Sequence, residues 1–235
     1  MKRFYKLVSF QSEPAGGFSI RLDGRPVKVP SGAVMLAPSE DMAGALVKEW
    51  AAQGEKIVPD MMPLTQILTT RIDRVSKERS AMTDALMKYL DTDLLCYRAA
   101  QPAELAKMQQ ESWDPFLAWF AEAFGVRPQT TTGLAALKQG AALHSAVHEH
   151  VNKMTDDVFT VLQLVSSLSG SLILGLAFCA GKITPEQVFD CAHVEERHKA
   201  AIYNEDFYGP DPAEAKKRSA MRADLEAAAV YLKLL

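Results

Sequence analysis

The first 37 residues alternate between apolar and polar positions with a period of two, which is typical of β-strands. Strands are predicted at residues 4–10, 18–22, 27–29 and 34–37. Asp23 and Gly24 lie between the second and third runs as structural residues, because both residue types tolerate the positive φ angles of a type I′ turn. The chain is therefore predicted to begin with a small sheet that contains a tight hairpin.

Beyond this sheet, apolar residues recur every three or four positions, which is the helical period. Ser39 is a typical N-cap, and the apolar stripe of Met42, Leu46 and Trp50 stops at Gly54. This helix is predicted to cover the sheet, with Trp50 packed between them as a structural residue. Further helices are predicted at residues 64–75, 82–90, 103–124, 141–154, 158–180, 185–203 and 212–235.

These patterns predict an α+β fold with two domains. Residues 1–62 are expected to form a β-rich domain with one covering helix, and residues 63–235 an all-helical bundle domain. The chain has 235 residues, of which 48% are hydrophobic, so there is ample material for a buried core. A folded globular protein is expected.

The uncharged run from Val158 to Ala180 is longer than the ~20 residues that cross a bilayer. Polar side chains within the run and the acidic pair Asp156-Asp157 at its start argue against a membrane span. Small residues at 167, 171 and 175 would instead let neighbouring helices approach closely. We expect a buried bundle helix and no membrane insertion, with a membrane-bound assembly factor as an alternative.

Charge and cysteine content argue against a nucleic-acid-binding protein and against a disulfide-stabilised secreted protein. A net charge of −3 and a pI near 6.0 provide no basic field for nucleic acid. Cys96, Cys179 and Cys191 show no CxxC spacing and are predicted to be buried thiols in a reducing compartment. Residues 1–10 resemble neither a secretory signal nor a transit peptide, so a bacterial cytoplasmic location is expected.

Two histidine clusters raise the alternative of a metal-dependent enzyme in the helical domain. His144, His148 and His150 lie in HSAVHEH, where two imidazoles are one helical turn apart, but no glutamate follows His144 as a zincin requires. Glu195-x-x-His198 is one half of a di-iron pattern that needs two such steps. A solvated helix face is the simpler interpretation, and the enzyme alternative would use His144, His148 and His198.

No nucleotide site or catalytic motif is predicted. GLAFCAGKIT ends like a phosphate-binding loop, but five residues separate Gly175 from Gly181 where the motif needs four, and Ile183 occupies the hydroxyl position. A helix end at Gly181 explains the segment better. No catalytic residue, metal ligand or cofactor is therefore assigned.

The segment from Tyr89 to Trp119 combines an acid-rich turn with two tryptophans. Together with Leu22-Asp23-Gly24-Arg25-Pro26, Glu49-Trp50 and Met62-Pro63-Leu64-Thr65, it resembles the assembly chaperones that hold the alpha subunit of the F-type ATP synthase catalytic head. The resemblance spans roughly residues 3–206. It implies a protein, cytoplasmic in bacteria and in the mitochondrial matrix of eukaryotes, that prevents aggregation of the unassembled alpha subunit until the beta subunit replaces it.

The resemblance also implies where the partner binds. Glu195-Glu196 and Glu205-Asp206 match acidic positions of the family, whereas His198, Lys199 and Tyr203-Asn204 depart from its pattern. Glu196 is the first choice for a carboxylate that meets a cation on the client, with Glu195 beside it.

A second set of candidates comes from the acid-rich turn. Asp91, Asp93 and Arg98 are further partner-binding candidates, although Arg98 paired with Asp91 or Asp93 would instead fix the joint between helices. Trp113 is expected to be structural, and an exposed Trp113 or Trp119 would indicate a contact surface.

Overall fold

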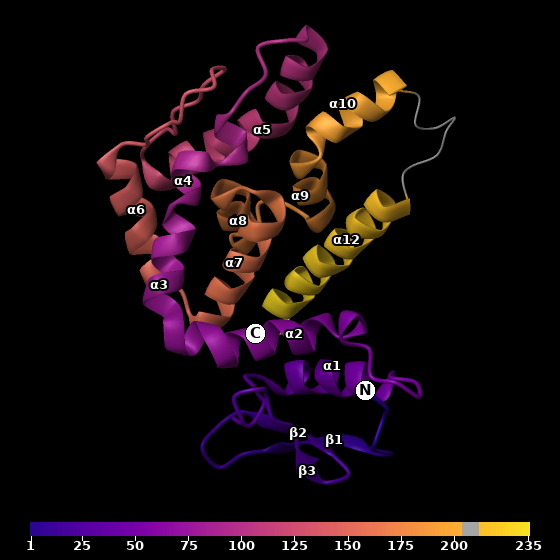
Figure 1. The fold of residues 1–235 in the computed structure, drawn as a ribbon. Helices are drawn as coiled ribbons and strands as arrows, with labels where there is room; N and C mark the ends of the chain where they lie inside the picture. Colours follow the sequence, from indigo (N-terminus) through magenta and orange to yellow (C-terminus); the bar gives the residue numbers. More distant parts are fainter. Residues whose placement is uncertain (204–211) are drawn as a thin grey trace. The chain divides into compact units, whose positions relative to one another are not determined.

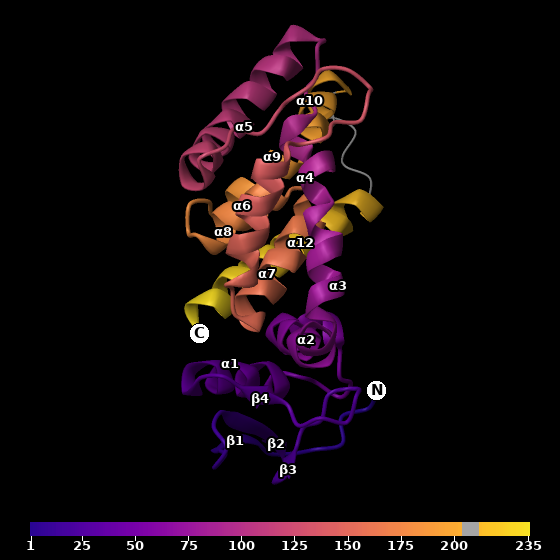
Figure 2. The ribbon, with the colours of Figure 1, turned by 90° about the vertical axis from the view of Figure 1, so that its left-hand side faces the viewer.

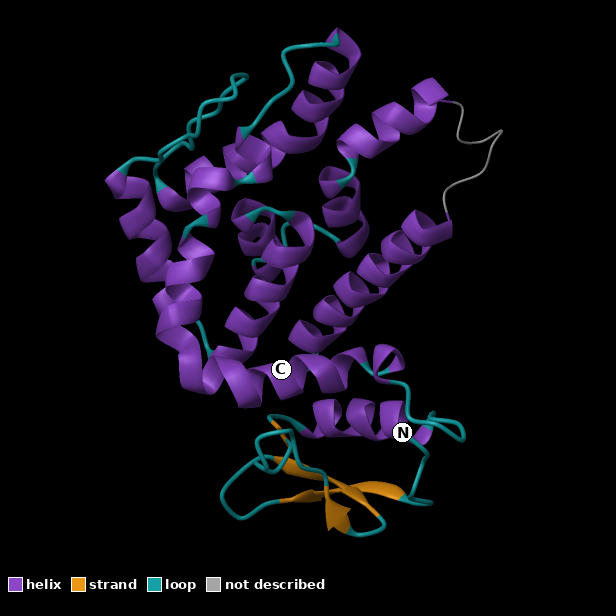
Figure 3. Cartoon of the chain, in the orientation of Figure 1, coloured by secondary structure: helices purple, strands orange, loops and turns teal. Residues whose placement is uncertain are grey.

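The computed structural model describes residues 1–203 and 212–235 (Figure 1). It confirms the predicted α+β class, with a small antiparallel sheet followed by many helices (Figure 3). The chain forms two compact units. The β unit comprises residues 1–79, 155–161 and 227–235, and the helical unit comprises the described residues of 80–154 and 162–226. The predicted division into independently folding domains, 1–62 and 63–235, stays a prediction.

The sheet contains β1 (Val8–Ser12), β2 (Phe18–Leu22), β3 (Arg25–Pro26) and β4 (Leu36–Ala37). β1, β3 and β4 all pair with β2 in antiparallel register. Asp23 and Gly24 have φ angles of 48° and 81°, so the predicted type I′ geometry is confirmed.

β1 starts later than predicted, because the chain before it has another hydrogen-bond partner. The N–H groups of Lys6 and Leu7 donate to the Asp23 carboxylate, with N···Oδ1 distances of 3.1 and 2.8 Å. These bonds, the one from Leu7 first, hold the pKa of Asp23 below its ordinary value. The hairpin side chain thus anchors the strand that precedes it.

Helix α1 (Glu40–Ala51) packs on the sheet through Met42, Ala43 and Leu46 (Figures 1 and 2). Its predicted cap is confirmed, since Ser39 Oγ accepts a hydrogen bond of 3.0 Å from Met42 N. Trp50 is partly buried, with its ring 5.8 Å from that of Tyr5, whose hydroxyl donates to the Trp50 carbonyl.

Helix α2 (Pro63–Thr70) follows a short 3-10 turn, η1 (Pro59–Met61), and runs into a π-helical turn, η2 (Arg71–Val75). Its first turn is capped by Glu49, whose carboxylate accepts from Leu64 N at 2.8 Å and from Thr65 N at 2.9 Å. Burial raises the pKa of Glu49 and outweighs these bonds. The segments Glu49-Trp50 and Met62-Pro63-Leu64-Thr65, which both carry the family resemblance, therefore meet at the start of α2.

The β unit also contains a buried carboxylate, Asp157, with two side-chain partners. Tyr231 is fully buried and donates its hydroxyl to Asp157 at 2.6 Å, while Arg71 lies 3.4 Å from the same carboxylate. Burial, with the carboxylate beside it, raises the pKa of Tyr231 well above its ordinary value. Contacts between residues so distant in sequence leave no local pattern.

The helical unit is built around one short, wholly apolar helix, α8 (Leu172–Cys179), whose residues 172–178 are buried. α8 packs on α4 (Tyr89–Thr92), α5 (Ala103–Phe124) and α9 (Pro185–Ala192). Within the described residues, the other helices that lie wholly or partly in this unit are α3 (Ser76–Met87), η3 (Leu94–Cys96), α6 (Ala141–Asn152), α7 (Asp156–Ser169), α10 (Val194–Tyr203) and α12 (Pro212–Lys233).

The long helix predicted at 158–180 is wrong, because two local features break it. Gly170 takes a positive φ of 70°, and Ser171 Oγ accepts from Leu174 N at 3.0 Å, which ends α7 and starts α8. Among the described residues, no helix is long and apolar enough to cross a membrane. A Cβ on Gly175 would lie only 2.3 Å from Ser166 Oγ, so the glycine permits a close approach between these two helices.

The helix predicted at 185–203 is likewise two helices, since His193 has non-helical dihedrals. Its predicted start is confirmed, because Thr184 and Gln187 form a reciprocal capping box ahead of Pro185. All three cysteines are free thiols, and burial raises the pKa of each to about 12.

Candidate functional site

Most of the predicted partner-binding residues lie in two places in the helical unit. We call residues 91–98 the joint segment and the pair Glu195-Glu196, in the first turn of α10, the acidic turn. The joint segment links α4 through η3 to the chain that precedes α5. The two places offer a partner very different access.

Asp93 is fully buried and serves as a double cap. Its carboxylate accepts from Leu95 N at 3.1 Å, which starts η3, and from Ser171 Oγ and Ile173 N at 2.7 and 3.0 Å, which start α8. Burial raises the pKa of Asp93 to about 6, although these hydrogen bonds oppose the shift. In this conformation Asp93 is not available to a partner.

Asp91 is partly buried and holds the chain that leads into α6. Its carboxylate accepts from Gln139 N at 2.7 Å and lies 3.1 Å from His144 Nε2. Burial raises the pKa of this carboxyl, but the bond from Gln139 and the one from His144 together lower it below its ordinary value. Asp91 therefore has an internal role even though part of its side chain is exposed.

Arg98 pairs with Asp114, not with Asp91 or Asp93 as the sequence suggested. Its Nη2 lies 2.5 Å from Asp114 Oδ1, its Nε donates to the Leu95 carbonyl at 3.0 Å, and its guanidinium lies 5.3 Å from the Trp113 ring. Asp114 is the middle residue of the Trp-Asp-Pro segment of α5. Nothing in the spacing of the sequence singles out this pair.

Trp113 is 1% exposed, and its indole N–H donates to the Cys191 carbonyl at 2.9 Å, which joins α5 to α9. Trp119 is partly exposed and lines a cavity of about 440 Å³ with Phe124 and His150. The two tryptophans thus have different surroundings, and Trp113 is buried as expected of a structural residue.

The acidic turn is exposed, and its two carboxylates differ in their bonding. Glu195 accepts a hydrogen bond of 3.3 Å from Gln109 Nε2, and the buried Gln109 in turn accepts from Ala99 N at 2.7 Å. Glu196 has no hydrogen bond or ion pair to any residue that the structure describes. Carboxylates in a first helical turn are favoured by the helix dipole.

Other predicted positions add little to this site. Glu205 and Asp206 lie outside the described residues. Gln109 was missed by the sequence analysis, because a glutamine within a helix has no pattern that distinguishes it from a solvated one. Its burial and its two hydrogen bonds show that Gln109 links Ala99, directly after the joint segment, to Glu195 of α10.

The histidine clusters do not converge. His144 is bonded to Asp91, and His148 to Asn152, with a distance of 3.1 Å in each case. Within 1–203 and 212–235, no group of three or more His, Cys, Asp or Glu side chains is arranged to hold a metal ion. No observation supports the metal-dependent alternative.

Comparison with known proteins gives one consistent result. The sequence model of the family described as ATP12 chaperone protein matches residues 2–121. The mitochondrial protein atp12 of Schizosaccharomyces pombe is 24% identical over 95% of this chain and 81% of its own length.

Two solved structures share the whole fold. Atp12 from Paracoccus denitrificans is 30% identical with a TM-score of 0.88, and covers 99% of this chain and 97% of its own. The Atu1473 protein of Agrobacterium tumefaciens is 32% identical with a TM-score of 0.89, at 99% and 85% coverage. With more than half of the sequence matched by the family model, and essentially all of the fold by a relative at 30% identity, the chain belongs to the ATP12 family of chaperone proteins.

Proposed function

We propose that this protein is an assembly chaperone that binds the unassembled alpha subunit of F-type ATP synthase until the beta subunit replaces it. The observation that carries the proposal is its membership of the ATP12 chaperone family. The proposed role needs no catalysis, cofactor, nucleotide or nucleic acid. A bacterial cytoplasmic location remains part of the proposal, to be checked by cell fractionation.

The physical task is to cover a surface that would otherwise aggregate. A subunit of an oligomer exposes, before assembly, apolar area that the complete complex buries. A holder shields this area, and the true partner displaces it by offering more binding free energy. The holder therefore needs only moderate affinity, so that release follows from competition alone.

Within the proposal, Glu196 is the residue expected to meet a cation on the client. It is exposed, lies in the first turn of α10, and has no bond within the described part of the chain. Glu195 contributes charge beside it while bonded to Gln109. Asp91 and Arg98 are secondary candidates because their internal bonds already engage them, and Asp93 would need a different conformation to take part.

Copurification tests the function. The tagged protein is expressed with the cognate alpha subunit or, separately, with the beta subunit, and capture is scored under identical conditions. We expect capture of alpha without beta and no ATP hydrolysis by the purified protein. Failure to retain alpha, together with turnover of a substrate, would contradict the proposed function.

The site is tested by Glu196→Lys beside a matched control. Glu122→Lys makes the same charge change at another exposed helical glutamate of the helical unit. We expect reversal at Glu196 to weaken alpha binding about tenfold, equivalent to ~1.4 kcal/mol, and the control to leave it unchanged. Equal affinities for the two variants would retain the function and discard Glu196 as its site.

A further inference from the structure

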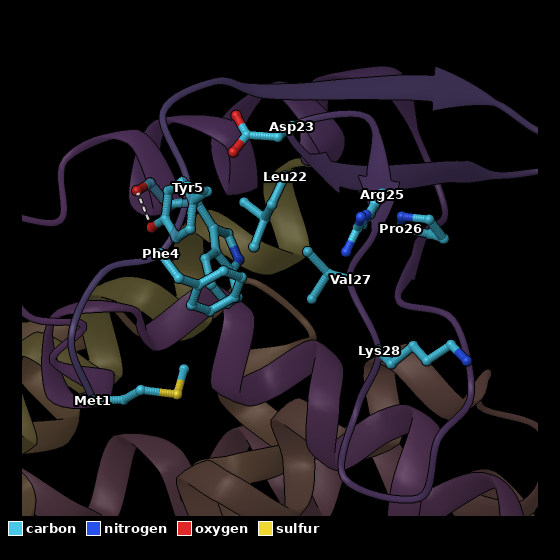
Figure 4. A pocket seen from close by; sticks show the side chains of 10 residues that line it. Met1, Phe4, Tyr5, Leu22, Asp23, Arg25, Pro26, Val27 and Lys28 are labelled. Carbon is cyan, nitrogen blue, oxygen red and sulfur yellow. Dashed lines mark hydrogen bonds between the residues drawn. The ribbon is translucent and has the colours of Figure 1, made fainter.

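The β unit contains a pocket of about 670 Å³ between the N-terminal segment, the β2–β3 hairpin and the end of α1 (Figure 4). A volume of this size is in the range that accommodates a ligand, not only a single side chain. The hairpin segment 22–26, one of those that carry the family resemblance, forms part of its lining. None of the residues of the acidic turn or the joint segment belongs to it.

One end of the pocket is aromatic. Figure 4 shows Phe4 and Tyr5 together there, and Trp50 also lines the pocket. The rings contact edge to face, with centroids 5.5 Å apart for Phe4 and Tyr5 and 5.8 Å for Tyr5 and Trp50. Phe4 is nevertheless 65% exposed. A phenylalanine left in water beside other rings is typical of a contact surface.

The other end is basic. Arg25 and Lys28 lie beyond Leu22 and Val27 in Figure 4, and both are exposed. Neither side chain has a hydrogen bond or a close ion pair to any residue of the described ranges, although the charge of Arg25 helps to lower the pKa of Asp23. The one carboxylate of the lining, Asp23, already accepts from two backbone N–H groups. The lining therefore has two positive side chains against one carboxylate, and Asp23 compensates Arg25 only in part.

An unbonded donor lies in the same lining. Trp50 Nε1 is buried and has no hydrogen-bond partner among the residues that the structure describes. Buried polar groups are nearly always bonded, so this unpaired N–H is an unusual feature of a residue that lines the pocket. An apolar and aromatic lining beside two exposed cationic side chains together define a specific chemistry.

We propose that this pocket binds an extended peptide segment of a client protein in which a carboxylate neighbours a large apolar side chain. The apolar side chain would lie against Phe4, Leu22 and Val27, and the carboxylate would meet Arg25 and Lys28. This inference extends the proposed chaperone function, because a holder of unassembled subunits encounters such segments exposed on its client.

Fluorescence anisotropy tests the proposal with the full-length protein. Three fluorescein-labelled decapeptides share a Leu-Phe centre that is flanked by Asp and Glu, by Asn and Gln, or by two lysines. We expect the acidic peptide to bind about tenfold more tightly than the amide peptide, and the lysine peptide most weakly.

Charge reversal makes the test specific to the pocket. The variant Arg25→Glu/Lys28→Glu should reverse the order of preference, so that the lysine peptide binds best. Lys48→Glu/Arg74→Glu, two exposed positions of the same unit outside the pocket, should keep the original order. A gain of binding by the reversed variant cannot result from misfolding.

Three outcomes would overturn the proposal. Equal affinity for the three peptides would remove charge recognition, and an unchanged order in the reversed variant would remove the pocket. Binding of decanoate but of no peptide would assign the pocket to a small amphipathic acid. Because these titrations contain no alpha subunit, their failure and a failure of alpha capture are separate results.

Discussion

The joint segment and the acidic turn carry similar carboxylates, yet they differ in what those carboxylates do. Asp93 is 0% exposed and accepts hydrogen bonds from three donors, whereas Glu196 is exposed and has none within the described residues. A buried charge is tolerated only when its oxygens are bonded, so its geometry is committed to the fold. An acidic residue of this protein is therefore the stronger candidate for recognition where the fold leaves it exposed and unbonded.

The largest expected effect comes from removing the buried carboxylate. Asp93→Ala leaves buried donors at Leu95, Ser171 and Ile173 without an acceptor, so we expect the free energy of unfolding to fall by about 3–5 kcal/mol. Urea denaturation measures this loss. Asp84→Ala, at an exposed position of α3, should change it by less than about 0.5 kcal/mol. Similar small losses for both variants would contradict the capping role.

The pH dependence of Asp93 is the next effect. Its pKa is near 3.8 when unfolded and about 6 when folded, so between these values the native carboxyl keeps a proton that the unfolded chain has lost. The resulting stabilisation, about 3 kcal/mol, is full below pH ~4, decreases as pH rises, and is absent above pH ~6.

Thermal or urea unfolding from pH 4 to 7.5 checks this sign against Asp93→Asn, which does not titrate in that range. The stability of the unmodified protein relative to the variant should decrease as pH rises and become constant above pH ~6. A difference that is flat over the whole range, or that increases with pH, would show that burial does not dominate at this carboxyl.

An intermediate effect is expected at the Arg98–Asp114 pair, which is close but only partly buried. A double-mutant cycle with Arg98→Ala and Asp114→Ala should give a coupling energy of about 1–2 kcal/mol in the free energy of unfolding. The exposed i,i+4 pair Lys107–Glu111 is the matched control and should couple by about 0.5 kcal/mol or less. Equal coupling in both pairs would remove the distinction between the joint segment and the surface.

The smallest effect on stability should come from the acidic turn itself. Glu196→Gln removes a charge that has no partner in the described chain, so we expect a change below about 0.5 kcal/mol in the free energy of unfolding. Calorimetry measures it alongside alpha capture. A loss above about 1 kcal/mol would mean that Glu196 stabilises the fold, which would contradict its contrast with Asp93.

Local patterns predicted a large part of the fold. The Asp23-Gly24 turn, the Ser39 cap, the 103–124 helix and the Thr184 capping box all appear where the residues indicated. In each case the structure depends on hydrogen bonds between residues a few positions apart, or on the dihedral preferences of single residues. The linear sequence is enough to predict features of this kind.

Other features depended on partners that are distant in sequence. The sequence suggested Asp91 or Asp93 as the partner of Arg98, but packing of α5 brings Asp114 to it. Glu49 caps α2 from the preceding helix. The break at Gly170 is decided partly by Asp93, which bonds Ser171 and the start of α8.

The sequence by itself determined the fold class, several helix starts and the family resemblance, because short-range backbone preferences and apolar periodicity are properties of the linear sequence. Only the tertiary structure decided which of several similar acidic residues are buried and bonded and which remain free. The physical reason is that desolvation and hydrogen bonding depend on the three-dimensional surroundings of a carboxylate. Asp93 and Glu196 both carry a carboxylate, but the fold buries the first and leaves the second exposed.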